Sequence, residues 1–174
     1  EIVKSMDEKN FDECLKHLEA ALKIATACKE YDFWKAECLV MIGNDLPALE
    51  RKYPKEPYVI YLKGLHAFVH NQVHLSLEYF QESLKLDPEF KKASAYKKIA
   101  ADVQKLESDA NNTNNVREAI AAYTSIIDYK HDNIHLKFKA YFKRAEHHFN
   151  LQNFQRAFED CSIALRLKIN ENND

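Results

Sequence analysis

Small residues recur along this chain at intervals that match the repeat of a helix pair. They are Cys14, Ala48, Ser76, Ala119 and Ala157, and the first two lie 34 residues apart. Two helices can pack closely only where the side chains between them are small. A small residue that returns once in each helix pair therefore predicts a stack of antiparallel helix pairs.

The clearest copy of the repeat runs over residues 57–90. Positions 8, 20, 24, 27 and 32 of this copy hold Gly64, Ser76, Phe80, Ser83 and Pro88. This is the spacing of a tetratricopeptide repeat, a unit of about 34 residues that folds as two antiparallel helices. The predicted fold class is therefore an all-α tetratricopeptide-repeat superhelix, which is an α-solenoid of antiparallel helix pairs.

The composition agrees with an all-helical chain and excludes several classes of function. The 174 residues contain only 2 Gly and 4 Pro, which is too few for many tight turns. The 25 basic and 27 acidic residues give a net charge of -2, so no general affinity for nucleic acid is expected. No apolar run approaches the roughly 20 residues of a membrane span. Phosphate-binding loops and nucleophile elbows need glycines, so we expect no enzyme and no cofactor.

The repeat pattern predicts two sub-arrays of helix pairs. Residues 1–110 form the first, with about three repeats, and residues 116–174 form the start of the second. Between them, residues 111–115 read Asn-Asn-Thr-Asn-Asn, which predicts a loop because these residue types are weak in helices. The first three of them also match a glycosylation sequon, which matters only in a secretory lumen.

The helices within the sub-arrays follow from apolar periodicity and from capping residues. In the second repeat, the second helix, over about 46–52, has lost more than a turn before Pro54 and Pro57. This shortening fits a bend built into the superhelix and equally fits decay of one repeat. Asp87 is predicted to cap a long helix over 88–109, with proline as its first residue. The other helices are predicted over residues 1–9, 11–26, 31–42, 116–128, 133–151 and 154–167.

Three segments carry a more specific resemblance. They read ACKEYDFWKAECLVMIG over 27–43, LKLDPEFKKA over 84–93 and AFEDCSIAL over 157–165. Together they resemble the middle arrays of J-domain co-chaperones of the tetratricopeptide-repeat type, the DnaJ homologue subfamily C. The similarity extends over most of the chain. The repeat motifs alone are unspecific, but the Lys-Ala-Glu-Cys helix and the long helix after the third repeat narrow the choice.

This resemblance implies a protein-binding adaptor without enzymatic activity. Such an adaptor gathers unfolded polypeptide clients or chaperones and passes substrate to a heat-shock chaperone of the seventy-kilodalton class. No His-Pro-Asp triplet occurs in the chain, so the tripeptide by which a J domain stimulates its partner is absent from it. The segment is more similar to the cytosolic members, so a cytoplasmic location is expected and the lumen of the endoplasmic reticulum is the alternative. A structural scaffold that assembles a fixed multiprotein complex is the alternative function.

The resemblance also indicates where a carboxylate clamp would lie. In related repeats, Lys, Asn and Arg side chains hold the acidic C-terminus of a heat-shock chaperone through charge-assisted hydrogen bonds. Lys139 and Lys143 match the helix that supplies the last two cations. The positions for Lys and Asn on the preceding helix hold Gln104 and Ser108 instead. We therefore expect a clamp remnant with two ammonium groups.

The concave face of the repeats is the second candidate binding surface. The groove positions of the first helices are mostly aromatic or aliphatic. They are Phe33, Trp34, Tyr58, Tyr61, Leu62, Leu65, Phe68 and Tyr96. If these side chains are exposed together, they form an apolar patch suited to unfolded polypeptide or to an amphipathic helix. The alternative is that they are core residues, since aromatic residues at helical spacing are usually buried.

Cysteines and histidines are the remaining candidates. Cys28 and Cys38 flank the start of the second repeat, and the fold can bring them together as a disulfide or leave them as reduced thiols. His66, His70 and His74 recur every four residues, and imidazoles one helical turn apart can bind zinc. No acidic or thiol ligand lies near them in the sequence, so no metal site is predicted.

Overall fold

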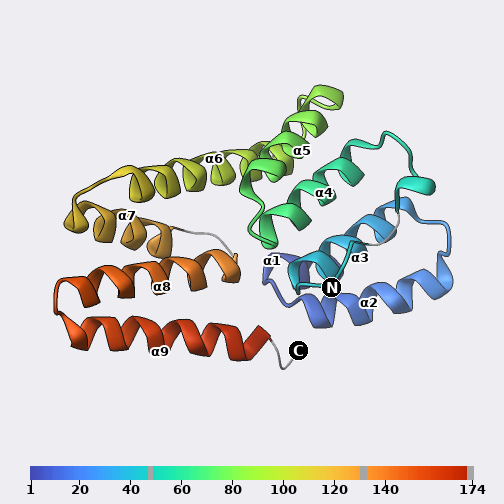
Figure 1. Cartoon of the computed structure of the whole chain (residues 1–174). Coiled ribbons are helices and arrows are strands. Elements are labelled where there is room, and N and C mark those ends of the chain that lie inside the picture. The colour runs from blue at the N-terminus through green and yellow to red at the C-terminus, as the bar shows by residue number, and fades with distance from the viewer. Residues whose placement is uncertain (47–48, 130–132, 172–174) are drawn as a thin grey trace. The chain divides into compact units, whose positions relative to one another are not determined.

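The structure is a computed structural model that describes residues 1–46, 49–129 and 133–171 (Figure 1). Within these ranges every regular element is a helix, which confirms the predicted all-α fold class. The chain divides into two compact units, residues 1–97 (unit 1) and residues 98–174 (unit 2). The border between the units falls inside helix α6.

Unit 1 consists of helices that pack against one another in chain order. Their bounds are α1 (Ile2–Asp7), α2 (Phe11–Ile24), α3 (Lys29–Met41), the 3₁₀ helix η1 (Leu49–Arg51), α4 (Pro57–Val69), α5 (Val73–Leu86) and the beginning of α6 (Lys91–Asn112). Contacts join α1 to α2, α2 to α3, α3 to α4 and α4 to α5. This succession of adjacent helix pairs agrees with a repeat solenoid.

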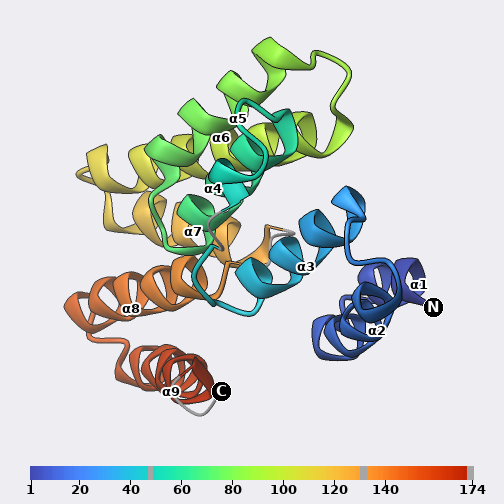
Figure 2. The ribbon, with the colours of Figure 1, turned by 90° about the vertical axis from the view of Figure 1, so that its right-hand side faces the viewer.

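Unit 2 contains the rest of α6 and three further helices in its described part. They are α7 (Val116–Asp128), α8 (Ile134–Asn150) and α9 (Phe154–Glu171). Contacts join α7 to α8 and α8 to α9, and Figures 1 and 2 both show α8 and α9 side by side. The helices predicted in this part of the chain are confirmed, with α9 extending four residues beyond its predicted end.

The turn between the two helices of a pair has the same geometry in three places. Lys9, Asn71 and Gln152 have φ angles of 57°, 59° and 59°, in the left-handed region. In all three turns the amide of the next residue donates to the carbonyl five residues earlier, at 2.8–2.9 Å. This closure satisfies carbonyls that the helix end leaves without a partner. Gly43, with φ of 86°, ends α3 with the same bonding, at 2.9 Å.

The second repeat thus has a first helix and its turn, but a regular second helix is not found among its described residues. The predicted helix over 46–52 is represented by η1, and Pro47 and Ala48 lie outside the described residues. Pro54 cannot continue a helix and disfavours helical geometry in the residue before it. Lys55, the next residue, has φ of 61°. The next regular α-helix that contacts α3 is α4.

The predicted start of the long helix is wrong by three residues. Asp87 caps no helix at Pro88, because its carboxylate accepts the amide of Glu89 at 3.1 Å and closes a turn. Phe90 then packs its ring against Tyr58, at 5.4 Å between centroids, and α6 begins only at the following residue. The helix continues to Asn112, so the first two residues of the predicted loop 111–115 are helical. The division into two repeat sub-arrays at this loop stays a prediction.

The small repeat positions act as predicted where α4 meets α5. A Cβ atom on Gly64 would lie 2.6 Å from two ring atoms of Phe80, and Phe80 itself is fully buried. Ser76 is also fully buried, and its hydroxyl donates to the carbonyl of Val73 at 2.7 Å. The two helices can therefore approach only because position 8 of this repeat has no side chain.

Gly64→Ala is expected to destabilise unit 1 by about 1–3 kcal/mol, because the added methyl group overlaps the Phe80 ring. Denaturant unfolding followed by circular dichroism measures this change. In a Phe80→Leu background the added cost of Gly64→Ala should shrink, since the overlapping ring is gone. Equal costs in the two backgrounds would contradict the proposed overlap.

Candidate functional site

The structure places most of the predicted groove residues inside unit 1. Five of the eight have at most 5% of their surface exposed, and they are Phe33, Tyr61, Leu62, Leu65 and Phe68. Trp34, Tyr58 and Tyr96 are partly buried. These five side chains therefore cannot contribute to the exposed apolar patch that the sequence analysis considered.

The aromatic groove positions are buried because they pack on one another. Phe33 stacks on Tyr58 with 4.9 Å between ring centroids and an interplanar angle of 9°. Tyr61 lies edge-on to Tyr58 at 5.5 Å and to Tyr96 at 6.0 Å. Such aromatic pairs add to the free energy gained by burial alone. The rings thus form the interior between α3, α4 and α6.

A buried carboxylate in α3 ties these three helices together. Glu37 is 7% exposed and accepts hydrogen bonds from the hydroxyl of Tyr61 at 3.1 Å and from the hydroxyl of Tyr58. Lys92 Nζ, from α6, donates to both carboxylate oxygens at 3.0 and 2.8 Å. Burial, together with the Glu37 charge, raises the pKa of both tyrosines, so they remain donors. Sequence reasoning missed this network because a single Glu in a helix carries no signal of burial.

Of the two alternatives for Cys28 and Cys38, the structure shows reduced thiols and no disulfide. Cys28 is the cap residue of α3 and Cys38 lies ten residues further along the same helix, roughly 15 Å away at the rise of an α-helix. A disulfide requires α-carbons less than about 7 Å apart. Cys38 packs instead with Cys14 and Leu18, and all four cysteines are free thiols.

The predicted clamp residues already have partners within unit 2. Lys139 Nζ lies 2.8 Å from a carboxylate oxygen of Glu107, and Lys143 Nζ lies 2.8 Å from one of Glu146. The lysine side chains are 45% and 42% exposed, so each pair contributes at most about 1 kcal/mol. A carboxylate ligand would compete with these glutamates for the ammonium groups. Whether the remnant grips a chaperone C-terminus stays a prediction.

The three histidines His66, His70 and His74 do not form one cluster. His66 and His70 stack with 4.2 Å between centroids, while His74 Nδ1 lies 3.5 Å from Glu78 on α5. Over the described residues, no group of three or more His, Cys, Asp or Glu side chains is placed to hold a metal ion. Over the same residues, no helix is long and apolar enough to cross a membrane.

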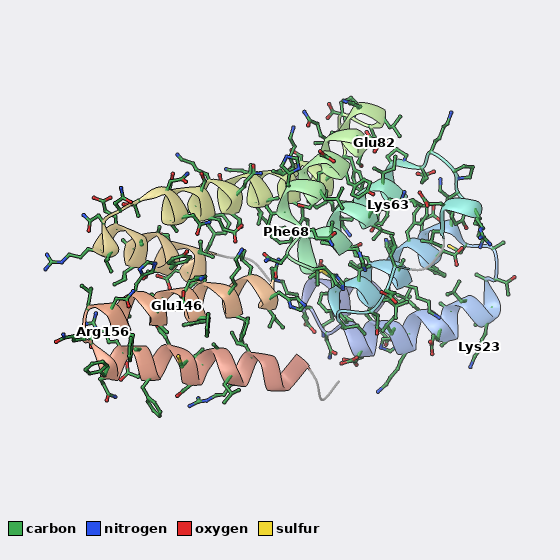
Figure 3. The ribbon with its side chains drawn as sticks, in the orientation of Figure 1. Lys23, Lys63, Phe68, Glu82, Glu146 and Arg156 are labelled. Carbon is green, nitrogen blue, oxygen red and sulfur yellow. The ribbon has the colours of Figure 1, made fainter. Side chains whose placement is uncertain are left out.

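An exposed apolar surface lies instead on α8 and α9, and we call it the α8–α9 face. Phe142 and Phe149 on α8 are 46% and 62% exposed, and Phe154 and Phe158 on α9 are 58% and 70% exposed. They surround an open hollow of about 760 Å³. Its lining is completed by Ala145, Glu146, His147, Asn150, Ala157 and Cys161. Figure 3 labels Glu146, which lies on α8 and supplies the carboxylate of this lining.

The α8–α9 face is hollow because small residues form its floor. Ala145 on α8 and Ala157 on α9 are 3% and 7% exposed, and they line the hollow between the larger rings. Phe149 and Phe154 meet edge-on across the turn, at 5.4 Å between centroids. The exposed rings and the small residues between them form one contiguous apolar surface, a feature that is typical of interaction sites.

A buried ion pair holds the helices of this face in place. Arg144 on α8 donates from Nε and Nη2 to the two carboxylate oxygens of Asp160 on α9, at 2.8 and 2.7 Å. Its Nη1 donates to Thr124 Oγ1 on α7, at 3.0 Å. The bonds to Asp160 raise the pKa of the guanidinium. The bidentate bonds fix α8 against α9, and the bond to Thr124 links α8 to α7.

The α8–α9 face was not identified from the sequence, although part of its signal is present there. Phe154, Phe158 and Leu165 recur at helical spacing along α9, which indicates an apolar stripe. The same spacing occurs on helices whose stripe is covered. Only the positions of the neighbouring helices show that this stripe is exposed.

Comparisons with curated proteins agree with the sequence resemblance. The chain is 24% identical to "DnaJ homolog subfamily C member 7" of Mus musculus and 25% identical to the Homo sapiens protein of that name, in both cases over 92% of its length. The chain is thus similar to these DnaJ proteins over most of its length. It is also 25% identical, over 74% of its length, to "DnaJ homolog subfamily C member 7 homolog" of Dictyostelium discoideum.

These DnaJ relatives are much longer than the chain. The chain spans about a third, 34%, of the length of the two mammalian proteins and 24% of the Dictyostelium discoideum protein. No family model matches the chain, and no solved structure matches it. The DnaJ resemblance seen in the sequence is thus confirmed by whole-chain similarity.

Asp160→Asn is expected to destabilise unit 2 by about 3 kcal/mol, because it leaves the buried Arg144 charge without its counter-ion. Lys143→Gln is the matched control, since it removes the exposed pair with Glu146 and should cost at most about 1 kcal/mol. Denaturant unfolding of both variants gives the two values. Equal losses would show that the Arg144 pair is not the tie between α8 and α9.

Acid is expected to destabilise unit 2 through His148. This residue is 6% exposed, and its Nδ1 has no hydrogen-bond partner among the described residues. Burial lowers the pKa of His148 below the ordinary 6.5, and Arg144, Arg156 and His147 act in the same direction against Asp160. Because the unfolded chain takes up the proton first, stability is full above pH 6.5 and falls as the pH drops toward the lower folded pKa.

The free energy of unfolding is measured above and below pH 6.5, the ordinary histidine pKa. His148→Gln should reduce the loss of stability on acidification, whereas His74→Gln, at an exposed side chain, should leave it unchanged. The same acid loss in wild type and His148→Gln would rule out His148 as its source.

Proposed function

We propose that this chain is a non-enzymatic, protein-binding co-chaperone module that captures unfolded client polypeptide on the α8–α9 face. The observation that carries the proposal is the cluster of four exposed phenylalanines around one hollow. The relatives named as DnaJ homologues support a role beside chaperones. A cytoplasmic location is part of the proposal, and the lumen of the endoplasmic reticulum is its alternative.

An apolar face of this kind suits clients that have lost their fold. Unfolded polypeptides expose apolar side chains that are normally buried, and contact with an exposed apolar surface removes both from water. The two alanines on the floor admit a bulky side chain between the phenylalanines. Ring edges and faces accept many side-chain shapes, so the face can bind unrelated sequences.

The proposal includes a heat-shock chaperone of the seventy-kilodalton class as the partner that receives the client. The two ammonium groups of Lys139 and Lys143 are its proposed contact, because both lysine side chains are more than 40% exposed. Ion pairs of exposed side chains exchange partners at little cost in free energy. A carboxylate from the chaperone can therefore replace either glutamate.

A structural scaffold is the second candidate function. The bidentate bonds between Arg144 and Asp160 hold the α8–α9 face in one arrangement, which suits a single permanent partner. The two functions differ in selectivity. A co-chaperone binds many denatured proteins weakly, whereas a scaffold binds one folded partner in fixed stoichiometry.

Replacing Phe149 and Phe158 by Ser should weaken client capture roughly tenfold, because about 1.4 kcal/mol of apolar contact is lost. Fluorescence anisotropy with labelled, reduced and carboxymethylated α-lactalbumin measures the affinity. Helicity by circular dichroism should not change, since both side chains are more than half exposed.

The matched control is Ile24→Ser with Val3→Ser on unit 1, where the side chains are 90% and 57% exposed. This control should leave client affinity unchanged, as it removes exposed apolar surface elsewhere. Equal affinity of wild type and the phenylalanine variant for the client would refute capture on the α8–α9 face.

A further inference from the structure

Ser94, on α6, differs from the other serines of the chain in the state of its hydroxyl group. The hydroxyl oxygens of six serines take part in hydrogen bonds, and these serines are Ser5, Ser76, Ser83, Ser108, Ser125 and Ser162. The hydroxyl of Ser94 has no such bond among the described residues. Ser94 is also exposed. Its oxygen is therefore free to react with a group that arrives from solution.

Two lysines precede Ser94 at the spacing that basophilic protein kinases recognise. Lys91 and Lys92 lie three and two residues before Ser94. Kinases of this class hold carboxylates in the substrate cleft, and these carboxylates pair with cations at the two positions, so the charge pattern selects the serine. Of the seven serines in the sequence, only Ser94 has a lysine or arginine at both positions.

The recognition segment is the first turn of α6, which is the part of a helix that opens at the lowest cost. The first amides of a helix have no partner within the helix. The amide of Ser94 donates to the carbonyl of Phe90 at 3.1 Å, which is the first bond of this turn. Lys91 is exposed like Ser94. A kinase cleft can therefore reach both side chains once this turn opens locally.

One of the two recognition lysines is engaged with a buried carboxylate. Lys92 Nζ donates to both carboxylate oxygens of Glu37 at 3.0 and 2.8 Å, and the lysine side chain is 44% exposed. A kinase has to take Lys92 from Glu37, which leaves that carboxylate with its tyrosine donors alone. The Glu37 pair thus restrains access to Ser94.

We propose that Ser94 is a phosphorylation site for a basophilic serine kinase, with ATP as the phosphoryl donor. The Ser94 oxygen forms a bond to the γ-phosphorus while the bond from that phosphorus to the oxygen bridging the β-phosphate breaks. ADP leaves with the electron pair of the broken bond, and the hydroxyl proton passes to a base of the kinase. This inference goes beyond the proposed function and does not depend on the α8–α9 face.

A phosphate on Ser94 would stand between two lysines. Lys91 and Lys97 lie three residues before and after Ser94, so both are its neighbours on the helix surface. Neither lysine forms an ion pair among the described residues. A phosphate carries a charge of about -2 and forms charge-assisted hydrogen bonds with ammonium groups. The first turn of α6 contains no acidic residue, so the phosphate also supplies the negative charge that stabilises this end of a helix.

The test treats the whole chain with ATP and the catalytic subunit of cAMP-dependent protein kinase, a kinase of the basophilic class. Mass spectrometry of proteolytic peptides should locate phosphate on Ser94, and Ser94→Ala should abolish it. Lys91→Ala should lower the initial rate about tenfold, because one recognition cation is lost. Lys85→Ala is the matched control and should leave the rate unchanged, since it removes an exposed lysine of α5 outside the segment.

Incorporation of phosphate that Ser94→Ala leaves unchanged would overturn this inference, as would absence of phosphate on Ser94. Equal rates for Lys91→Ala and Lys85→Ala would refute recognition by the preceding lysines. None of these outcomes bears on client capture, which is measured with denatured α-lactalbumin.

The restraint by Glu37 has a separate test. Glu37→Gln should raise the initial rate of phosphorylation several-fold, because Lys92 is released to the kinase. Tyr61→Phe is the matched control, since it removes a hydrogen bond to Glu37 and keeps the pair with Lys92. Far-ultraviolet circular dichroism checks that both variants are folded. Equal rates for the two variants would show that the Lys92 pair does not restrain Ser94.

The effect of the charge on α6 is measured by amide hydrogen exchange. Ser94→Asp, like the phosphate, should slow exchange in the first two turns of α6 several-fold. Ser108→Asp is the matched control, because it places the same charge near the other end of the helix, between Glu107 and Asp109. It should not slow exchange anywhere in α6. The same exchange in both variants would refute the proposed stabilisation of the first turn.

Discussion

The close approach of helix backbones at small residues is the constraint on which both units depend. Gly64 leaves no space even for a methyl group beside Phe80, and Ala145 and Ala157 form the floor between α8 and α9. Close approach brings the larger residues of each pair to the same outer surface. In unit 1 these large residues meet α6 and become core. In unit 2 they form the α8–α9 face.

Polar contacts then decide how rigid each arrangement is. In unit 1 the buried carboxylate of Glu37 gathers two tyrosines and Lys92, so the aromatic interior is closed by hydrogen bonds as well as by packing. In unit 2 the hydrogen bonds of Arg144 to Asp160 and Thr124 join three helices. Buried partners of this kind are costly to separate, unlike the exposed lysine pairs on α8. The apolar side chains of the α8–α9 face therefore lie on helices that are held rigidly in place. This arrangement suits binding of another polypeptide.

Much of the fold could be predicted from the sequence because helix periodicity and capping are local. Outside the second repeat, the helices whose bounds were predicted have their ends shifted by at most four residues in the structure. The turns at Lys9 and Gln152 were not predicted in detail, because left-handed geometry is usually signalled by glycine and here falls on other residues. The start of α6 was misplaced because an Asp-Pro pair serves equally as a helix cap and as a turn.

The sequence by itself determined the helix pairs, their small contact residues and the DnaJ resemblance, since each depends on residue type and spacing. It also showed which helix faces are apolar. Only the tertiary structure decided which of these faces are covered. Tyr61 and Phe68 are core because Tyr96 lies over them, whereas Phe142 and Phe149, at the same repeat positions, are exposed. Burial depends on neighbours distant in the chain, and periodicity within one helix carries no information about them.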